Sequence, residues 1–215
     1  MLRKTEVLVC NVILVCTVSL TALAQKSKPP KPRDSLHELS KKAGGHFVFR
    51  YKPNRSSVYP NIEELAKRSD LIVVGRTVGH RTSLRPDGNF ITNDYTVRVQ
   101  DVIKGDLPKR ASILVTLPGG TFRFPDGTFA TVMPIGEKTV EDRQQYIFFL
   151  KAKKAKGVFN GYLLISETQG VFGLTNAGVE PGDTVSGHPL ATKYRGMPAR
   201  DFLAQIHQAV PRKKK

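Results

Sequence analysis

A run of four apolar residues, LIVV at 71–74, follows directly on a helix-like segment and constrains the fold more than any other feature. The preceding NIEELAKRSD begins with Asn61, which suits a helix N-cap, and carries acidic residues in its first turn. Leucine and β-branched residues in succession, with no alternating polar residue, are typical of a strand buried on both faces. Gly75 then permits a bulge or a sharp bend. The sequence therefore predicts a strand at 71–74 whose side chains all lie in the core.

Short apolar segments separated by glycine and proline predict a mainly β fold around this strand. Along 93–104 apolar and polar residues alternate until Val102 and Ile103, which are both apolar and adjacent. This change of phase indicates a bulge near Gln100 and Asp101. Many short strands, with one helix before the sheet and one after it, indicate a small barrel or sandwich. Further strands are expected at 46–51, 112–117, 146–150 and 161–166, turns at 85–89 and 125–127, helices at 35–43, 61–69 and 198–209, a basic connection at 151–157 and a loop from 175 to 197.

The first 24 residues have the pattern of a secretory signal peptide. Arg3 and Lys4 precede an apolar run that ends in Ala22-Leu23-Ala24, so cleavage is expected after Ala24. An uncleaved membrane anchor is the alternative, because the run is just long enough to span a bilayer. Both cysteines of the chain lie in this segment. The mature protein would then have no disulfide, and its stability would depend on its core.

Positive charge is concentrated at the two ends of the chain. The whole sequence carries a net charge of +16, but residues 61–192 hold sixteen basic against fourteen acidic residues. Basic, proline-containing tails are typical of solvated segments that attract polyanions, although solubility alone would also explain them. The tail residues that could contact a polyanion are Lys26, Lys28, Lys31, Arg33, Arg212, Lys213, Lys214 and Lys215. The expected divisions are a signal peptide at 1–24, a basic segment at 25–60, one β-rich domain at 61–210 and a basic tail at 211–215.

Five motifs in a fixed order resemble a group of exported bacterial domains of unassigned function. They are SDLIVVGRTV, YTVRVQDVIKGD, ILVTLPGG, YIFFL and GYLLIS, followed by a C-terminal helix. The same order is similar to the netrin-like domain, the OB-type barrel of the tissue inhibitors of metalloproteases. The resemblance covers about residues 61–174 and the last helix. It implies a small OB-type or netrin-like barrel with a helix before the first core strand and a C-terminal helix.

Two departures limit what this resemblance implies. The inhibitors place an N-terminal cysteine on zinc, and the mature chain here has no cysteine, so inhibition by that mechanism does not transfer. The segment between Gly136-Glu137 and YIFFL is also longer than in the bacterial pattern. The bacterial group has no known activity to carry over.

No catalytic, cofactor or metal motif stands out in the sequence. Ser186 and His188 are close in VSGHP, but no nucleophile-elbow pattern surrounds them. Glu180, Asp183 and His188 could hold a metal, although a solvated loop with scattered charges explains them better. Phe122-Arg123-Phe124 has the aromatic–basic alternation of a single-strand binder, and hairpin packing of Phe124 is the favoured alternative. No cofactor and no metal are therefore predicted.

These observations favour an exported, non-enzymatic domain, periplasmic or secreted, that binds a protein partner or an anionic envelope surface. A polyanion binder acting through the basic tails is the first alternative, and a hydrolase with an unrecognised site is the second. The signal-peptide pattern argues against nucleic acid as a partner, because exported proteins rarely meet it. No transmembrane segment is expected after signal cleavage.

Overall fold

The computed structural model describes residues 34–53, 58–108, 110–136, 138–155, 158–185 and 187–210. The predicted signal peptide and both basic tails lie outside these residues. No helix in the described part of the chain is long and apolar enough to cross a membrane.

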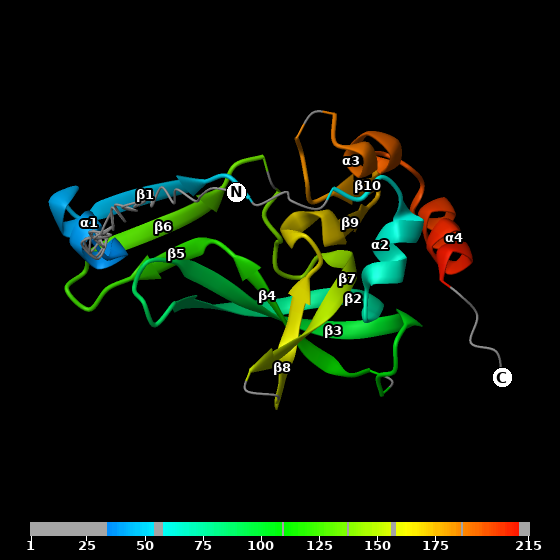
Figure 1. Ribbon diagram of the computed structural model, residues 1–215, viewed down its shortest axis with the longest axis horizontal. Coiled ribbons are helices and arrows are strands. Elements are labelled where there is room, and N and C mark those ends of the chain that lie inside the picture. The colour runs from blue at the N-terminus through cyan, green and yellow to red at the C-terminus, as the bar shows by residue number, and fades with distance from the viewer. Residues whose placement is uncertain are drawn as a thin grey trace, which may run out of the picture. The chain divides into compact units, whose positions relative to one another are not determined.

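Strands predominate in the described chain (Figure 1). The helices are α1 (Leu36–Lys42), α2 (Ile62–Arg68), α3 (Pro189–Tyr194) and α4 (Ala199–Ala209), with a short 3-10 helix, η1 (Glu167–Gly170). The strands are β1 (His46–Tyr51), β2 (Leu71–Leu84), β3 (Ile91–Lys104), β4 (Ser112–Pro118), β5 (Gly120–Arg123), β6 (Phe129–Pro134), β7 (Gln145–Ala155), β8 (Val158–Leu164), β9 (Val171–Thr175) and β10 (Gly178–Pro181).

The larger sheet closes on itself. Its strand order is β10-β9-β7-β2-β3-β4-β8, and an additional β7–β8 pairing joins β7, β2, β3, β4 and β8 into a ring. The β4–β8 pair is parallel, and the other pairs of the ring are antiparallel. A closed ring of five strands is the architecture of a small OB-type barrel. With α2 before β2 and α4 at the C-terminal end, the structure confirms the predicted fold class.

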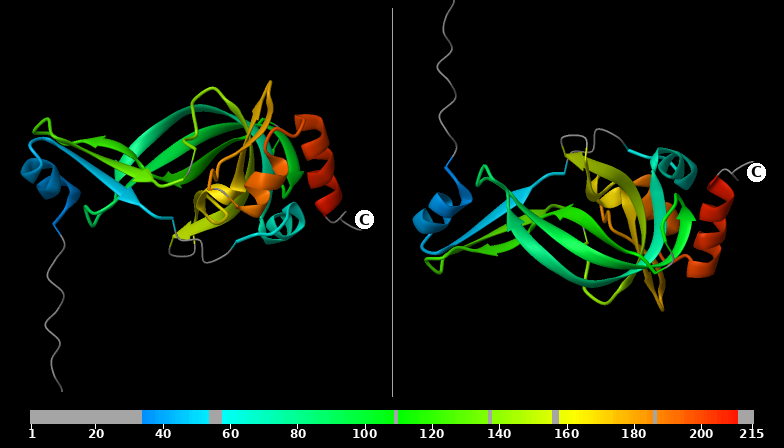
Figure 2. Two further views of the ribbon diagram at one scale, coloured as in Figure 1. Left: turned by 90° about the horizontal axis from the view of Figure 1, so that it is seen from above. Right: turned by 90° about the horizontal axis from the view of Figure 1, so that it is seen from below.

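The LIVV run is buried on both faces, as the sequence predicts. It pairs with β7 on one side and β3 on the other. Leu71 and Val73 point into the barrel interior, whereas Ile72 and Val74 belong to a second apolar cluster with residues of α2, α3 and α4. Figure 2 shows α2 and α4 outside the barrel wall in both views. The helices therefore cover the outward side of this strand.

The predicted bulge lies beside Gly75. The register between β2 and β3 passes from Val74 opposite Asp101 to Gly75 opposite Val99, so Gln100 is the extra residue. A Cβ atom on Gly75 would lie 2.5 Å from Cγ1 of Val97. Close approach of the two strands thus requires glycine here.

Two segments differ from the sequence-based expectation. The predicted basic connection at 151–157 is wrong in its first part, because β7 continues through Ala155 and pairs with β8. Lys151 lies at the surface and pairs with Asp70 at 2.8 Å, so this basic residue does not prevent the strand from continuing. The predicted loop from 175 to 197 contains β10 and α3. Proline and glycine suggested a loop, but β10 pairs with β9 and α3 buries Leu190 and Tyr194.

A second, three-stranded sheet has the order β1-β6-β5. β1, from the segment predicted to precede the domain, pairs in parallel with β6, and β5 and β6 form the predicted hairpin. Its core joins Leu36 of α1 and Phe124 to Ile91 of β3, together with Ala130 and Val132 of β6. This small sheet carries the candidate site.

Candidate functional site

Among the described strands, β1 forms one edge of the three-stranded sheet and has no partner on its second side. The backbone N–H of Phe129 donates to the carbonyl of Gly45 at 2.9 Å, and that of Ile135 donates to the carbonyl of Tyr51 at 2.9 Å. In a parallel ladder, alternate residues direct their backbone groups to the same neighbour, so positions 45, 47, 49 and 51 face β6. His46, Val48 and Arg50 therefore direct their N–H and C=O groups away from the sheet. We call these groups the β1 edge, and no described strand pairs with them.

The start of β1 is fixed by the end of α1. The N–H of Gly45 donates to the carbonyl of Ser40 at 2.8 Å, which closes the last turn of the helix. Gly44 and Gly45 have φ values of +75° and +113°, in the region that favours glycine. The chain thus reverses from helix into strand within two residues. Aromatic and β-branched residues then favour the extended conformation of β1.

The outer face of this sheet is apolar and basic. Cross-strand partners place His46 beside Phe129 and Arg123, and Arg50 beside Met133. Val48 is 40% exposed and Met133 is 45% exposed. These side chains form an open surface that contains no carboxylate, since the remaining outward positions are threonines.

Exposed apolar residues concentrate at this sheet. Among the described residues nine large hydrophobic side chains are exposed, and five of them lie on β1, on β6 or directly after β6. They are Val48, Phe49, Phe129, Met133 and Ile135. Such a concentration on one small sheet is the pattern of an interaction surface rather than of scattered surface residues.

The inner side of the β1 edge opens on an apolar groove. Its volume is about 310 Å³, and apolar side chains of α1 and β1 line most of it. The lining residues are Leu36, Leu39, Phe47 and Phe49, together with the polar Asp34 and Asn89. Phe49 is 38% exposed although it belongs to the inner face. A strand added to β1 would therefore meet apolar surface on its inner face and the apolar and basic surface on its outer face.

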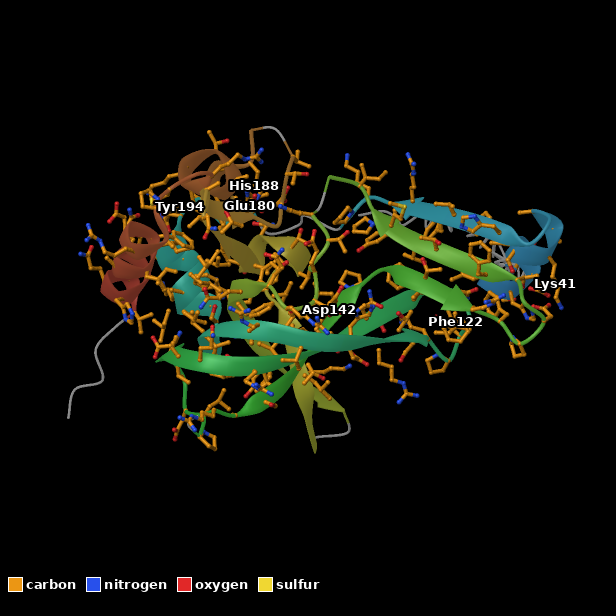
Figure 3. All side chains as sticks on the ribbon, turned by 180° about the vertical axis from the view of Figure 1, so that it is seen from behind. Lys41, Phe122, Asp142, Glu180, His188 and Tyr194 are labelled. Atoms are coloured by element: carbon orange, nitrogen blue, oxygen red, sulfur yellow. The ribbon has the colours of Figure 1, made fainter. Side chains whose placement is uncertain are left out.

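Charged contacts hold α1 beside the groove. Asp126, in the turn between β5 and β6, accepts from His37 at 2.8 Å and pairs with Lys41 at 3.3 Å. The hydrogen bond with His37, followed by that with Thr128, holds the pKa of Asp126 well below its usual range. Figure 3 shows Lys41 beside this sheet. The ionised Asp126 carboxylate thus ties α1 to the β5–β6 hairpin.

The Phe122-Arg123-Phe124 motif is mainly packing, as favoured from the sequence. Phe124 is buried, and its ring stacks on His37 with centroids 4.2 Å apart. Phe122 is partly buried against Phe124 in an edge-to-face contact. Only Arg123 projects from the outer face, so the motif offers no pair of exposed rings for base stacking.

The cleft near the LPGG turn offers structural contacts rather than catalytic groups. It has a volume of about 250 Å³ between the ends of β3 and β4, the hairpin and the segment 138–140. The Tyr95 hydroxyl donates to the carbonyl of Val140 at 2.9 Å, and burial raises the pKa of Tyr95. Asn93 accepts from Thr82 at 2.6 Å. The Tyr95 hydroxyl thus ties the segment 138–140 to β3, whereas the Asn93 bond joins β3 to β2.

The region around His188 is not the solvated loop favoured from the sequence. Asp183 and His188 are buried, with 3.9 Å between their nearest charged atoms, whereas Glu180 pairs with Lys138 at the surface. Figure 3 shows His188 and Glu180 near α3 and β10. No group of three metal-ligating side chains occurs within the described residues. Ser186 lies outside them.

The tail residues proposed for polyanion contact also lie outside the described residues, both Lys26 to Arg33 and Arg212 to Lys215.

Sequence reasoning predicted β1 but not its role, because edge position depends on which strand pairs with which. The alternating aromatic residues of HFVFRY were the available signal. Searches against protein-family models and against curated proteins found no match to the chain.

Proposed function

We propose that this protein is an exported, non-enzymatic binding domain that adds an extended segment of a partner protein to the β1 edge. The observation that carries the proposal is the row of backbone groups at His46, Val48 and Arg50, which no strand in the described part of the chain pairs with and which exposed apolar side chains flank. Open edges of this kind are used for strand addition in peptide recognition, where backbone hydrogen bonds give affinity. Export rests on the signal-peptide pattern, and mass spectrometry of the secreted protein should find Gln25 as its first residue.

The two faces of β1 define the partner's side chains. An added strand alternates its side chains between the outer face and the groove. On the outer face they would lie beside His46 and Arg50, with no carboxylate nearby, so acidic side chains fit. On the inner face they would meet Phe47 and Phe49, so apolar side chains fit. The preferred segment therefore alternates acidic and apolar residues.

An eight-residue peptide that alternates glutamate and valine is a direct probe. Fluorescence anisotropy with the labelled peptide should give a dissociation constant of about 10–100 μM, as expected for a few hydrogen bonds and a small apolar contact. A peptide with lysine in place of glutamate should bind at least about tenfold more weakly, because it would face Arg50. Equal binding of the two peptides would contradict the proposed charge preference.

Two variants of Val48 separate the backbone from the side chain. Val48→Pro removes an N–H that points away from β6, so it should leave the sheet intact and weaken the glutamate–valine peptide at least about tenfold. Val48→Thr keeps the donor and should change affinity less than about threefold. Binding that survives Val48→Pro in a folded protein would refute strand addition. Binding to anionic vesicles but not to the peptide would favour the envelope-surface alternative.

A further inference from the structure

Two arginines lie directly opposite each other on the outside of the barrel. Arg76 of β2 and Arg98 of β3 are register partners in the antiparallel pair. Their sequence neighbours point into the protein and are buried, whereas both arginines are exposed. Side chains at such positions begin about 5 Å apart, so the two guanidinium groups project from one spot.

Nothing in the described chain neutralises this pair. None of the ion pairs among the described residues includes Arg76 or Arg98. Arg76 donates instead to the backbone carbonyl of Arg143 at 3.2 Å, which orients its guanidinium but leaves its charge in place. Like charges directly opposite each other destabilise a sheet. Stability therefore does not account for the pair.

The residues beside the pair on these strands are uncharged, and Val78 and Leu114 among them are exposed. Ser112 of β4 lies opposite Arg98 and extends the row across a third strand. In the next row Gly79 lies opposite Thr96, and Thr96 lies opposite Leu114. The outward positions of β3 and β4 hold no aromatic residue. A chain could thus lie across these strands and reach both guanidinium groups, but bases would find no ring to stack on among the outward residues of β3 and β4.

We infer that Arg76 and Arg98 form an anion site for a linear polymer that carries sulfate or phosphate groups and lacks aromatic bases. Guanidinium groups recognise tetrahedral oxyanions through paired N–H donors, and two of them side by side can hold one such group between them. The near balance of charge over residues 61–192 gave no indication of this site. The site is local, lies on the barrel rather than at the β1 edge, and does not depend on the proposed function.

The test compares two double variants of the full mature chain, Arg76→Gln/Arg98→Gln and Arg195→Gln/Arg200→Gln. Both remove two exposed arginines, so net charge and the basic tails are matched. Heparin and inorganic polyphosphate are the probes, and binding is measured by titration from about 50 to 300 mM salt, where each contact contributes to the salt slope. The barrel variant should lose at least about tenfold in affinity and one to two units of slope, against less than about threefold for the control.

Several results would overturn the inference. Equal losses of affinity in the two double variants would show that net charge alone binds the polymer. If the protein bound neither heparin nor polyphosphate, the proposed site would be wrong. Oligothymidylate binding as tight as heparin, with the same loss in the barrel variant, would contradict the exclusion of nucleic acid. The thermal midpoint of the barrel variant should equal or exceed that of the wild type, since it relieves repulsion. A clear fall in that midpoint would give the arginines a structural role instead.

Discussion

Truncation of neighbouring residues in the central strand tests the two-sided burial on which the fold depends. Ile72 and Val73 are both 0% exposed, yet they point to opposite sides, Ile72 toward the helices and Val73 into the barrel. Ile72→Ala removes three carbons, worth about 2.4 kcal/mol at about 0.8 kcal/mol each, and the cavity raises the cost to about 3–4 kcal/mol. Val73→Ala removes two carbons and should cost about 2–3 kcal/mol. Each loss is large against a typical total of about 5–15 kcal/mol.

Urea denaturation measures these changes in the free energy of unfolding. Val78→Ala is the matched control, because Val78 lies on the same strand and is 44% exposed. It should change stability by no more than about 0.5 kcal/mol. If either Ile72→Ala or Val73→Ala cost as little as this control, one face of the strand would be solvated. The closed barrel with an outer helical layer would then be wrong.

Two further predictions concern a turn and a carboxylate. Gly120→Ala should destabilise the protein by about 2 kcal/mol or more, because φ is +125° and the new Cβ would lie 2.6 Å from Oδ1 of Asn93. Gly45→Ala is the control: its φ is +113° but no atom lies near the new Cβ, so the substitution should cost only the backbone strain of about 1 kcal/mol. Thermal or urea melts measure both changes. His37 holds the pKa of Asp126 low, so that carboxylate stabilises the fold above its unfolded pKa of about 3.9 and the stabilisation is lost as pH falls below it. In melts from pH 6 to pH 2 the stability of the wild type should therefore fall toward that of Asp126→Asn. A constant difference in stability between the two proteins would show that the Asp126 carboxylate does not stabilise the fold.

Local patterns in the sequence predicted most of the barrel. The LIVV run, the slip at Gln100 and the helix at 198–209 each depend on side chains within a few residues, and the structure confirms them. β10 escaped prediction because it is short and ends in Pro181, and its existence depends on pairing with β9. Local propensity does not encode such partners.

The candidate site escaped prediction for a related reason. HFVFRY indicates a strand, but whether its second edge is paired depends on the order β1-β6-β5. Arg76 and Arg98 lie 22 positions apart, and only the register after the bulge sets them opposite each other. Edge position and cross-strand pairing are features of tertiary structure. The proposed strand addition at β1 and the proposed anion site at Arg76 and Arg98 both depend on them.

Backbone hydrogen exchange along β1 tests the central claim most directly. In the free protein the amides of Phe47, Phe49 and Tyr51 should be protected by β6, and those of His46, Val48 and Arg50 should exchange freely. Saturation with the glutamate–valine peptide should protect the second set and leave the first unchanged. If the peptide binds while these three amides stay unprotected, the partner is not added at the β1 edge and the proposed function is wrong.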